Sequence, residues 1–167
     1  MALIVEDGTQ VAGANSYASL DTIKAYAVAR GVTLGIDSII TTQVLKAMDY
    51  LEGKRKDYQG NKVAVTQSLQ FPRINVVIDD FEFPSTSIPS MLIQAECQLV
   101  IEQSLGIDFM PTMNEPTIKS ETIGPIKTEY AVNPGAIFEP FSYAVNALLE
   151  PLFKSGSNAF GVTFLRV

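Results

Sequence analysis

The sequence predicts a mainly α fold, which is a small helical bundle with extended β arms or a hairpin and a C-terminal tail strand. Two segments, around residues 40–51 and 89–105, have apolar residues at helical spacing, and residues 117–132 alternate polar and apolar side chains as strands do. With 167 residues, 47% of them hydrophobic, the chain is sized for one globular domain. Within it we place a helical core at 1–116, with an extended loop inserted at 63–87, and a β arm, a short helix and a docking tail at 117–167.

A short strand at residues 3–5 and a helix over residues 20–30 are the first predicted elements. Ser19 precedes the helix and is a suitable N-cap, because its hydroxyl can accept a backbone N–H of the first turn. Gly31 follows the helix at the position where a left-handed residue commonly ends one.

The second predicted helix has a single apolar stripe, at steps of four, four and three residues, made by Ile40, Val44, Met48 and Leu51. Ser38 or Thr41 can cap its start, and Gly53 ends it. The third helix, residues 89–105, is apolar nearly all round, so we expect it at the centre of the core. The single cysteine, Cys97, lies in this helix and is predicted to be a small buried hydrophobic residue.

Residues 63–87 show no sustained periodicity, and Pro72 and Pro84 exclude a long helix there. We expect an extended excursion with at most a short strand at residues 75–78. Its acidic residues Asp79, Asp80 and Glu82 could in principle bind Mg²⁺ or Ca²⁺. Adjacent acids in a proline-flanked loop are more often a solvated surface, so we predict no metal site.

The C-terminal third is predicted to contain two strands on either side of Gly124-Pro125, a short helix at residues 141–153 and a β-prone tail. The tail places an apolar row on one strand face, and its predicted partner-binding residues are Phe160, Val162, Phe164 and Leu165. An exposed apolar strand favours pairing with another chain. We therefore expect the tail to dock on a neighbour; the alternative is an edge strand on its own domain.

The composition excludes several classes of enzyme site. The chain has no histidine and one cysteine, which rules out a Ser–His–Asp triad, a Cys–His pair and an ordinary zinc site. It also lacks both common glycine-rich phosphate-binding motifs. A Ser–Lys dyad stays open, but no particular pair is indicated. We predict no enzymatic activity, no catalytic residues and no cofactor.

Charge argues against nucleic acid as the main partner, because the chain has 12 basic and 18 acidic residues and a net charge of −6. The possible nucleic-acid contacts form one cluster: Lys54, Arg55, Lys56, Tyr58 and Lys62. There, cations could meet phosphates while Tyr58 stacks on a base. The alternative is a solvated helix C-terminus, where cations interact favourably with the helix dipole. No apolar run approaches a membrane span, and the start does not read as a signal peptide, so we expect no membrane partner and synthesis in the cytoplasm.

Several motifs occur in a recognisable order: VEDGTQVAGANSYASLDTIKAYAVARG, KAMDYLEGKR, LQFPR, IP before the long helix, and KSETIGPIKTEY. Together they resemble a family of tailed-phage and prophage proteins that is labelled DnaT-like single-stranded DNA-binding and looks related to head–tail connectors. The resemblance covers about the first 130 residues.

The likeness to head–tail connectors implies a structural adaptor. Its copies would form a ring that docks on the portal and presents a surface to the next neck or tail protein. Twelve subunits are usual in such rings, and DNA would pass through the lumen without specific binding. The location implied is the virion neck, after synthesis in the host cytoplasm. The acidic charge and the extended segments favour this prediction. The alternatives are a single-stranded DNA-binding replication accessory protein and, third, a tail terminator or other neck ring.

Overall fold

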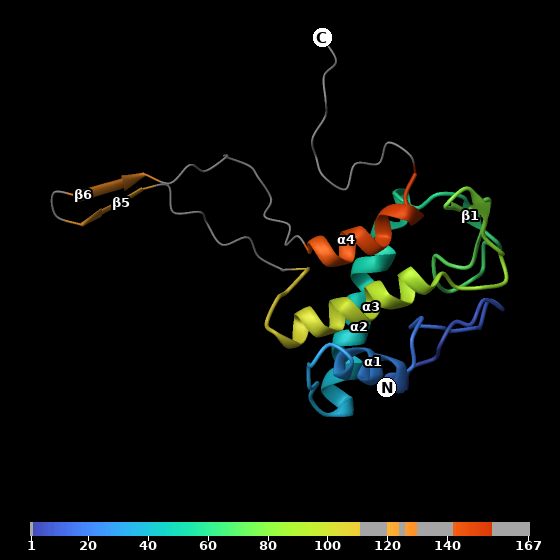
Figure 1. Cartoon of the computed structure of the whole chain (residues 1–167), viewed down its shortest axis with the longest axis horizontal. Helices are drawn as coiled ribbons and strands as arrows, with labels where there is room; N and C mark the ends of the chain where they lie inside the picture. Colours follow the sequence, from blue (N-terminus) through green and yellow to red (C-terminus); the bar gives the residue numbers. More distant parts are fainter. Residues whose placement is uncertain (1, 111–119, 124–125, 130–141, 155–167) are drawn as a thin grey trace, which may run out of the picture.

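The computed structural model describes residues 2–110, 120–123, 126–129 and 142–154 (Figure 1). This part of the chain contains four α-helices, two short 3-10 turns and three two-stranded antiparallel sheets. The fold is therefore a mixture of packed helices and small strand pairs, rather than a helical bundle alone.

The central helix is α3, Ser90–Ser104, which packs against the other three helices: α1 (Leu20–Val28), α2 (Asp37–Gly53) and α4 (Tyr143–Leu149). Its apolar surface extends nearly all round, and the core position predicted for it is confirmed. Cys97 is buried there, as predicted, and burial raises the pKa of its thiol to about 12. Helix α4 belongs to the same core, since Val145 and Leu149 are fully buried against it.

The predicted cap residues of α1 are confirmed. Ser19 is the N-cap, and its Oγ accepts the backbone N–H of Thr22 at 3.1 Å. Gly31 has a left-handed backbone with φ +73°. Both signals are local, which is why the sequence alone reveals them.

Helix α2 has the predicted buried stripe, Ile40, Val44, Met48 and Leu51, but it begins earlier than expected. Neither Ser38 nor Thr41 caps it, because both lie inside the helix and the N-cap residue, Ile36, makes no side-chain cap bond. Asp37 instead pairs with Lys24 Nζ at 2.6 Å, which joins the start of α2 to α1.

The expected strand at residues 3–5 is wrong in extent, since only Val5 makes a bridge, to Ser16. The N-terminal segment is held by buried Glu6, whose Oε1 accepts the backbone N–H groups of Gly8 and Gln10, both at 2.9 Å. This side chain supports the segment together with two backbone hydrogen bonds, from Glu6 N to the carbonyl of Ser16 and from Asn15 N to the carbonyl of Ile4, both at 2.9 Å.

The segment between α2 and α3 contains two hairpin-like pairs, where an excursion with at most one short strand was predicted. Strand β1 (Asn61–Lys62) pairs with β2 (Arg73–Ile74), and β3 (Val77–Ile78) pairs with β4 (Phe81–Glu82). Asp79 and Asp80 both have positive φ, 51° and 66°, and form the two-residue turn between β3 and β4. Asp tolerates the left-handed region, so the acidic pair is explained by turn geometry.

The LQFPR segment fixes this region to the core. The peptide bond Phe71-Pro72 is cis. The Phe71 ring packs edge-on against the Tyr58 ring, with 5.2 Å between the ring centroids. Buried Arg73 donates from Nε to the carbonyl of Gln59 and from a terminal nitrogen to that of Gly60, both at 2.8 Å. The guanidinium thus satisfies carbonyls that have no strand partner.

The two strands predicted around Gly124-Pro125 are confirmed as β5 (Ser120–Ile123) and β6 (Ile126–Glu129), which pair from Ser120↔Glu129 to Ile123↔Ile126. The predicted helix at 141–153 is confirmed as α4, which continues into the 3-10 turn η2 (Glu150–Leu152). In the described ranges, no helix is long and apolar enough to cross a membrane.

Candidate nucleic-acid interface

The basic cluster lies where α2 ends. The helix continues into the 3-10 turn η1, Lys54–Lys56, whose three residues are all basic. Side chains in such a turn are about 120° apart, so they fan out from the helix end. Cations are favourable there because the helix dipole is negative at its C-terminus. Lys54 also lies over the ring of Tyr50, with Nζ 5.1 Å from the ring centroid.

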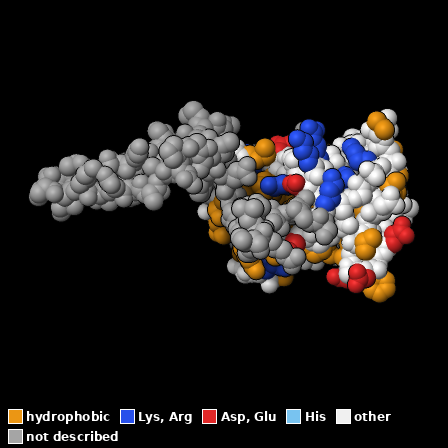
Figure 2. All heavy atoms as spheres, turned by 90° about the horizontal axis from the view of Figure 1, so that it is seen from above, with side chains coloured by type: hydrophobic (Ala, Val, Ile, Leu, Met, Phe, Trp, Pro, Cys, Tyr) orange, Lys and Arg blue, Asp and Glu red, His pale blue; other side chains and the backbone are white. Residues whose placement is uncertain are grey.

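A fourth cation joins this cluster from the far end of the described chain. Lys154 Nζ donates to the carbonyl of Lys56 at 2.9 Å, and Lys154 N donates to the carbonyl of Asp57 at 2.8 Å. Phe153 bridges to Tyr58 at the same place. We call Lys54, Arg55, Lys56 and Lys154 the basic patch; Figure 2 shows Lys and Arg side chains gathered on this side of the folded body. No local sequence signal indicated Lys154, because 98 residues separate it from Lys56.

Tyr58 is not placed where a base could stack on it, so that predicted role is wrong. Its side chain is 1% exposed, its hydroxyl donates to the carbonyl of Leu51 at 3.1 Å, and its ring packs against Phe71 and Phe153. Burial raises the pKa of its hydroxyl far above the ordinary value. Tyr58 is a core residue that attaches the turn after η1 to the rest of the fold.

Lys62, the last predicted contact, lies on β1 and is half-buried. Its Nζ donates to the carbonyl of Gln67 at 3.0 Å, across the loop between β1 and β2. The structure thus brings together Lys54, Arg55 and Lys56, and it gives Lys62 a local bond within its own loop.

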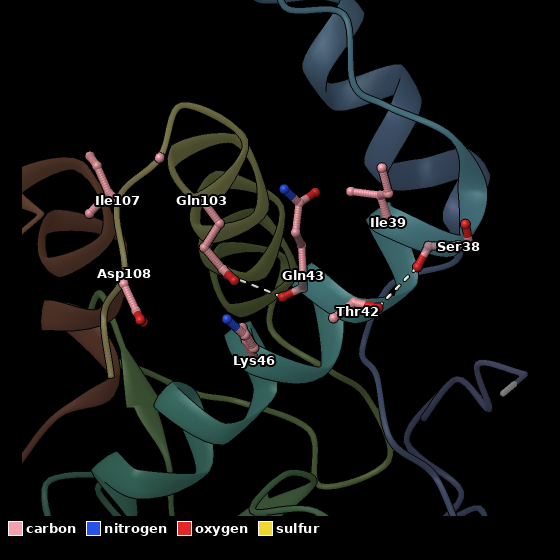
Figure 3. Close-up of a pocket in the computed structure, with 9 residues that line it drawn as sticks. Ser38, Ile39, Thr42, Gln43, Lys46, Gln103, Ile107 and Asp108 are labelled. Atoms are coloured by element: carbon pink, nitrogen blue, oxygen red, sulfur yellow. Dashed lines mark hydrogen bonds between the residues drawn. The ribbon is translucent and has the colours of Figure 1, made fainter. Parts of the chain in front are cut away.

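A groove of about 500 Å³ lies between α2 and the segment that follows α3 (Figure 3). It is lined by Ser38, Ile39, Thr42, Gln43, Lys46, Gln103, Gly106, Ile107 and Asp108. Gln103 Nε2 donates to the carbonyl of Gln43 at 3.1 Å, which joins the two walls. The side-chain oxygen of Gln43 is buried and has no hydrogen-bond partner. None of these residues was predicted from the sequence to bind a ligand, and Ser38 was predicted only as a possible helix cap.

Two carboxylates, one buried and one partly buried, support the fold near Tyr17. Glu96, on α3, accepts the Ser16 hydroxyl at 2.6 Å and the Tyr17 N–H at 2.9 Å, and burial raises its pKa to about 7. Glu52, on α2, accepts the Tyr17 hydroxyl and the Gln70 N–H, and burial raises its pKa too. Every one of these bonds joins separate segments, so we assign both acids a structural role.

Among the residues that the structure describes, no group of three or more His, Cys, Asp or Glu side chains is arranged to hold a metal ion. Asp79, Asp80 and Glu82 are exposed on the β3–β4 hairpin. The predicted tail residues Phe160, Val162, Phe164 and Leu165 lie outside the described residues, so their docking stays a prediction.

A family model described as "Putative DnaT-like ssDNA binding protein" matches residues 1–167. No curated protein and no solved structure shows significant similarity to the chain. The match contradicts the predicted connector function and the virion role attached to it, and it agrees with the alternative, a single-stranded DNA-binding protein. The predicted ring, the portal and tail partners and the neck location depend on that connector function, and neither the structure nor the family match tests them.

The motifs that produced the resemblance are now placed in the fold. Glu6 and Gly8 of the first motif order the N-terminal loop, and Phe71 and Arg73 of LQFPR hold the β1–β2 region to the core. KSETIGPIKTEY contains the β5–β6 pair. These motifs therefore have structural roles in this chain, and the family match covers the whole sequence, including the last 37 residues that the resemblance did not cover. The chain belongs to the family described as putative DnaT-like ssDNA-binding proteins.

Proposed function

We propose that this protein binds single-stranded DNA through the basic patch, without catalysing a reaction. The observation that supports this most is the contact of Lys154 with Lys56, which adds a fourth cation to the three of η1. The family description supplies the class of ligand.

The net charge of −6 does not argue against this proposal, because net charge is a sum and binding depends on its distribution. The four basic side chains lie around the end of α2 and attract phosphates locally, while the exposed acids Asp79, Asp80 and Glu82 lie on the β3–β4 hairpin, whose strand β3 contacts η2. Affinity in such a site comes mainly from the release of counterions from the strand.

The salt dependence follows from the number of phosphates that the patch can neutralise. Each contact contributes about −0.7 to the slope of log K against log salt for a single strand. Four contacts therefore predict a slope of about −3, with weak binding at physiological salt.

The test is fluorescence anisotropy of the full chain with a labelled single-stranded oligonucleotide over a series of salt concentrations. Lys54→Ala/Arg55→Ala is expected to make the slope shallower by about 1.4, and Lys154→Ala by about 0.7. The matched control is Lys24→Ala/Arg30→Ala, which also removes one lysine and one arginine. Lys24 lies on α1, where it pairs with Asp37 at the start of α2, and Arg30 lies just after α1. The patch, in contrast, lies at the end of α2 (Figure 1).

Two results would overturn the proposal. One is the absence of binding even at low salt. The other is an equal loss of affinity in the control and the patch variant, which would mean that the strand responds to total charge and not to this surface.

A further inference from the structure

Lys54 of the basic patch continues the face of α2 that lines the groove. Gln43, Lys46, Tyr50 and Lys54 follow one another at steps of three, four and four residues, which is the spacing of neighbours on one helix face. The eleven residue-to-residue steps from Gln43 to Lys54 span about 16 Å along the helix axis. A DNA strand that contacts Lys54 and continues along this face of α2 therefore reaches the groove.

The face is held in place by the segment after α3. The rings of Tyr50 and Phe109 pack at 5.6 Å between centroids, and Gln103 bonds to the carbonyl of Gln43. These contacts make the groove a preformed part of the fold. Figure 3 shows the Gln43 side chain rising between α3 and Ile39, with Lys46 one turn further along the helix.

The chemistry of the groove suits a nucleobase. Ile39 and Ile107, each about half exposed, form apolar sides, while Lys46 is the one cation and Asp108 the one acid in the lining. The buried oxygen of Gln43 lacks a donor, and one oxygen of Asp108 is used by the N–H of Met110 at 3.0 Å. A buried acceptor without a partner is costly, and a ligand that brings an N–H group removes that cost.

Only one other buried side-chain oxygen in the described part of the chain is without a partner, and it belongs to Glu6. The second oxygen of that carboxylate binds two backbone N–H groups inside the N-terminal loop, and Glu6 does not line this groove. The unpartnered oxygen of Gln43 differs from that of Glu6, because Gln43 lines a groove of about 500 Å³, a volume typical of ligand sites.

We propose that this groove takes one base of the bound strand, and that it favours a base with an exocyclic amino group, which donates to the Gln43 oxygen. Lys46 then meets an adjoining phosphate. This inference rests on the proposed single-stranded DNA binding. Cytosine carries an amino group where thymine carries a carbonyl oxygen, so thymine offers no donor to the Gln43 oxygen.

The test compares oligo(dC) with oligo(dT) of equal length in the anisotropy assay with the full chain. Both are pyrimidine strands with the same number of phosphates, so the charge contribution is matched. We expect oligo(dC) to bind about tenfold more tightly, a ratio at the lower end of base discrimination by good hydrogen-bonded pairs. Gln43→Leu should abolish the preference and leave both the affinity for oligo(dT) and the salt slope of oligo(dT) binding unchanged.

Gln43→Leu should also raise the melting temperature of the free protein, because it removes the unpartnered acceptor. Gln94→Leu, the same change on α3 outside the groove lining, is the control and should keep the preference. If Gln43→Leu does not fold, the second variant is Ile107→Trp, which fills the groove from a partly exposed position. It must lower the affinity for oligo(dC) more than the affinity for oligo(dT).

The outcomes separate this inference from the proposed function. Equal binding of oligo(dC) and oligo(dT) by the wild type, or a preference that survives Gln43→Leu or Ile107→Trp, overturns the base-binding groove while binding through the patch stands. Failure to bind either strand at low salt overturns the proposed function itself.

Discussion

Replacing Glu96 by glutamine should change how the stability of this protein depends on pH. Glu96 is fully buried on the central helix and holds the Ser16 hydroxyl and the Tyr17 N–H. Burial raises the pKa of this carboxyl to about 7, against 4.5 for an unperturbed glutamate. The folded protein therefore keeps a proton on Glu96 over a range of pH in which the unfolded chain has lost it.

The sign and size of the effect follow from linkage. Between about pH 4.5 and pH 7 the folded state binds more protons than the unfolded state, so the free energy of unfolding falls as pH rises. The contribution of Glu96 is fully present below pH 4.5 and lost as pH rises through about 7. At 1.36 kcal/mol for each pH unit, this window amounts to roughly 3 kcal/mol. Glutamine does not titrate, so Glu96→Gln should remove this component.

The assay is urea unfolding followed by circular dichroism, at about pH 5 and about pH 8, for the wild type and the variant. Between these two pH values the wild type should lose roughly 2–3 kcal/mol of its free energy of unfolding through Glu96, and Glu96→Gln should not show this loss. Glu52→Gln is a useful comparison, because burial raises the pKa of Glu52 in the same direction. If the difference between wild type and Glu96→Gln is the same at both pH values, the argument from burial is refuted.

Two further predictions concern the β1–β2 region, each with a matched control. Gly60→Ala should lower the free energy of unfolding by at least about 2 kcal/mol, because φ is +66° and a Cβ atom would lie 2.1 Å from the carbonyl oxygen of Ile74. Gly53→Ala, where no atom lies within 4 Å, should be neutral or slightly stabilising; similar losses in both would contradict the steric argument. Phe71→Ala should cost about 3–5 kcal/mol in thermal or urea unfolding, whereas Phe81→Ala, at a 77% exposed position, should change stability by less than about 0.5 kcal/mol. Equal effects at the two phenylalanines would show that Phe71 does not anchor the core.

The candidate site was predictable only in part, for a physical reason. Lys54, Arg55 and Lys56 are consecutive, so the sequence displays them as a cluster. Tyr58 belongs to the same stretch, but its ring enters the core and its contact with a base was wrongly predicted. Lys154 joins the patch through packing of η2 against the turn after η1, which no sequence window contains.

Local signals determined most of the helical fold from the sequence. The stripe from Ile40 to Leu51, the cap at Ser19 and the left-handed Gly31 each depend on neighbours within a few residues, and the structure has them as predicted. The Asp79-Asp80 turn also depends on neighbouring residues alone. In the sequence these two acids were considered for their charge, whereas the structure shows that they adopt the positive φ values of the turn.

The sequence by itself determined which segments are helical, which helix is central and that the Gly124-Pro125 break separates two strands, because periodicity and backbone preference act over short distances. Only the tertiary structure decided where the charges meet and which polar groups lack a partner. The net charge of −6 was fixed by composition, yet the basic patch and the groove beside Gln43 arise from contacts between α2, the end of α3 and the chain after α4. Electrostatic attraction and hydrogen bonding depend on distances in space, and those distances are set by packing and not by order along the chain.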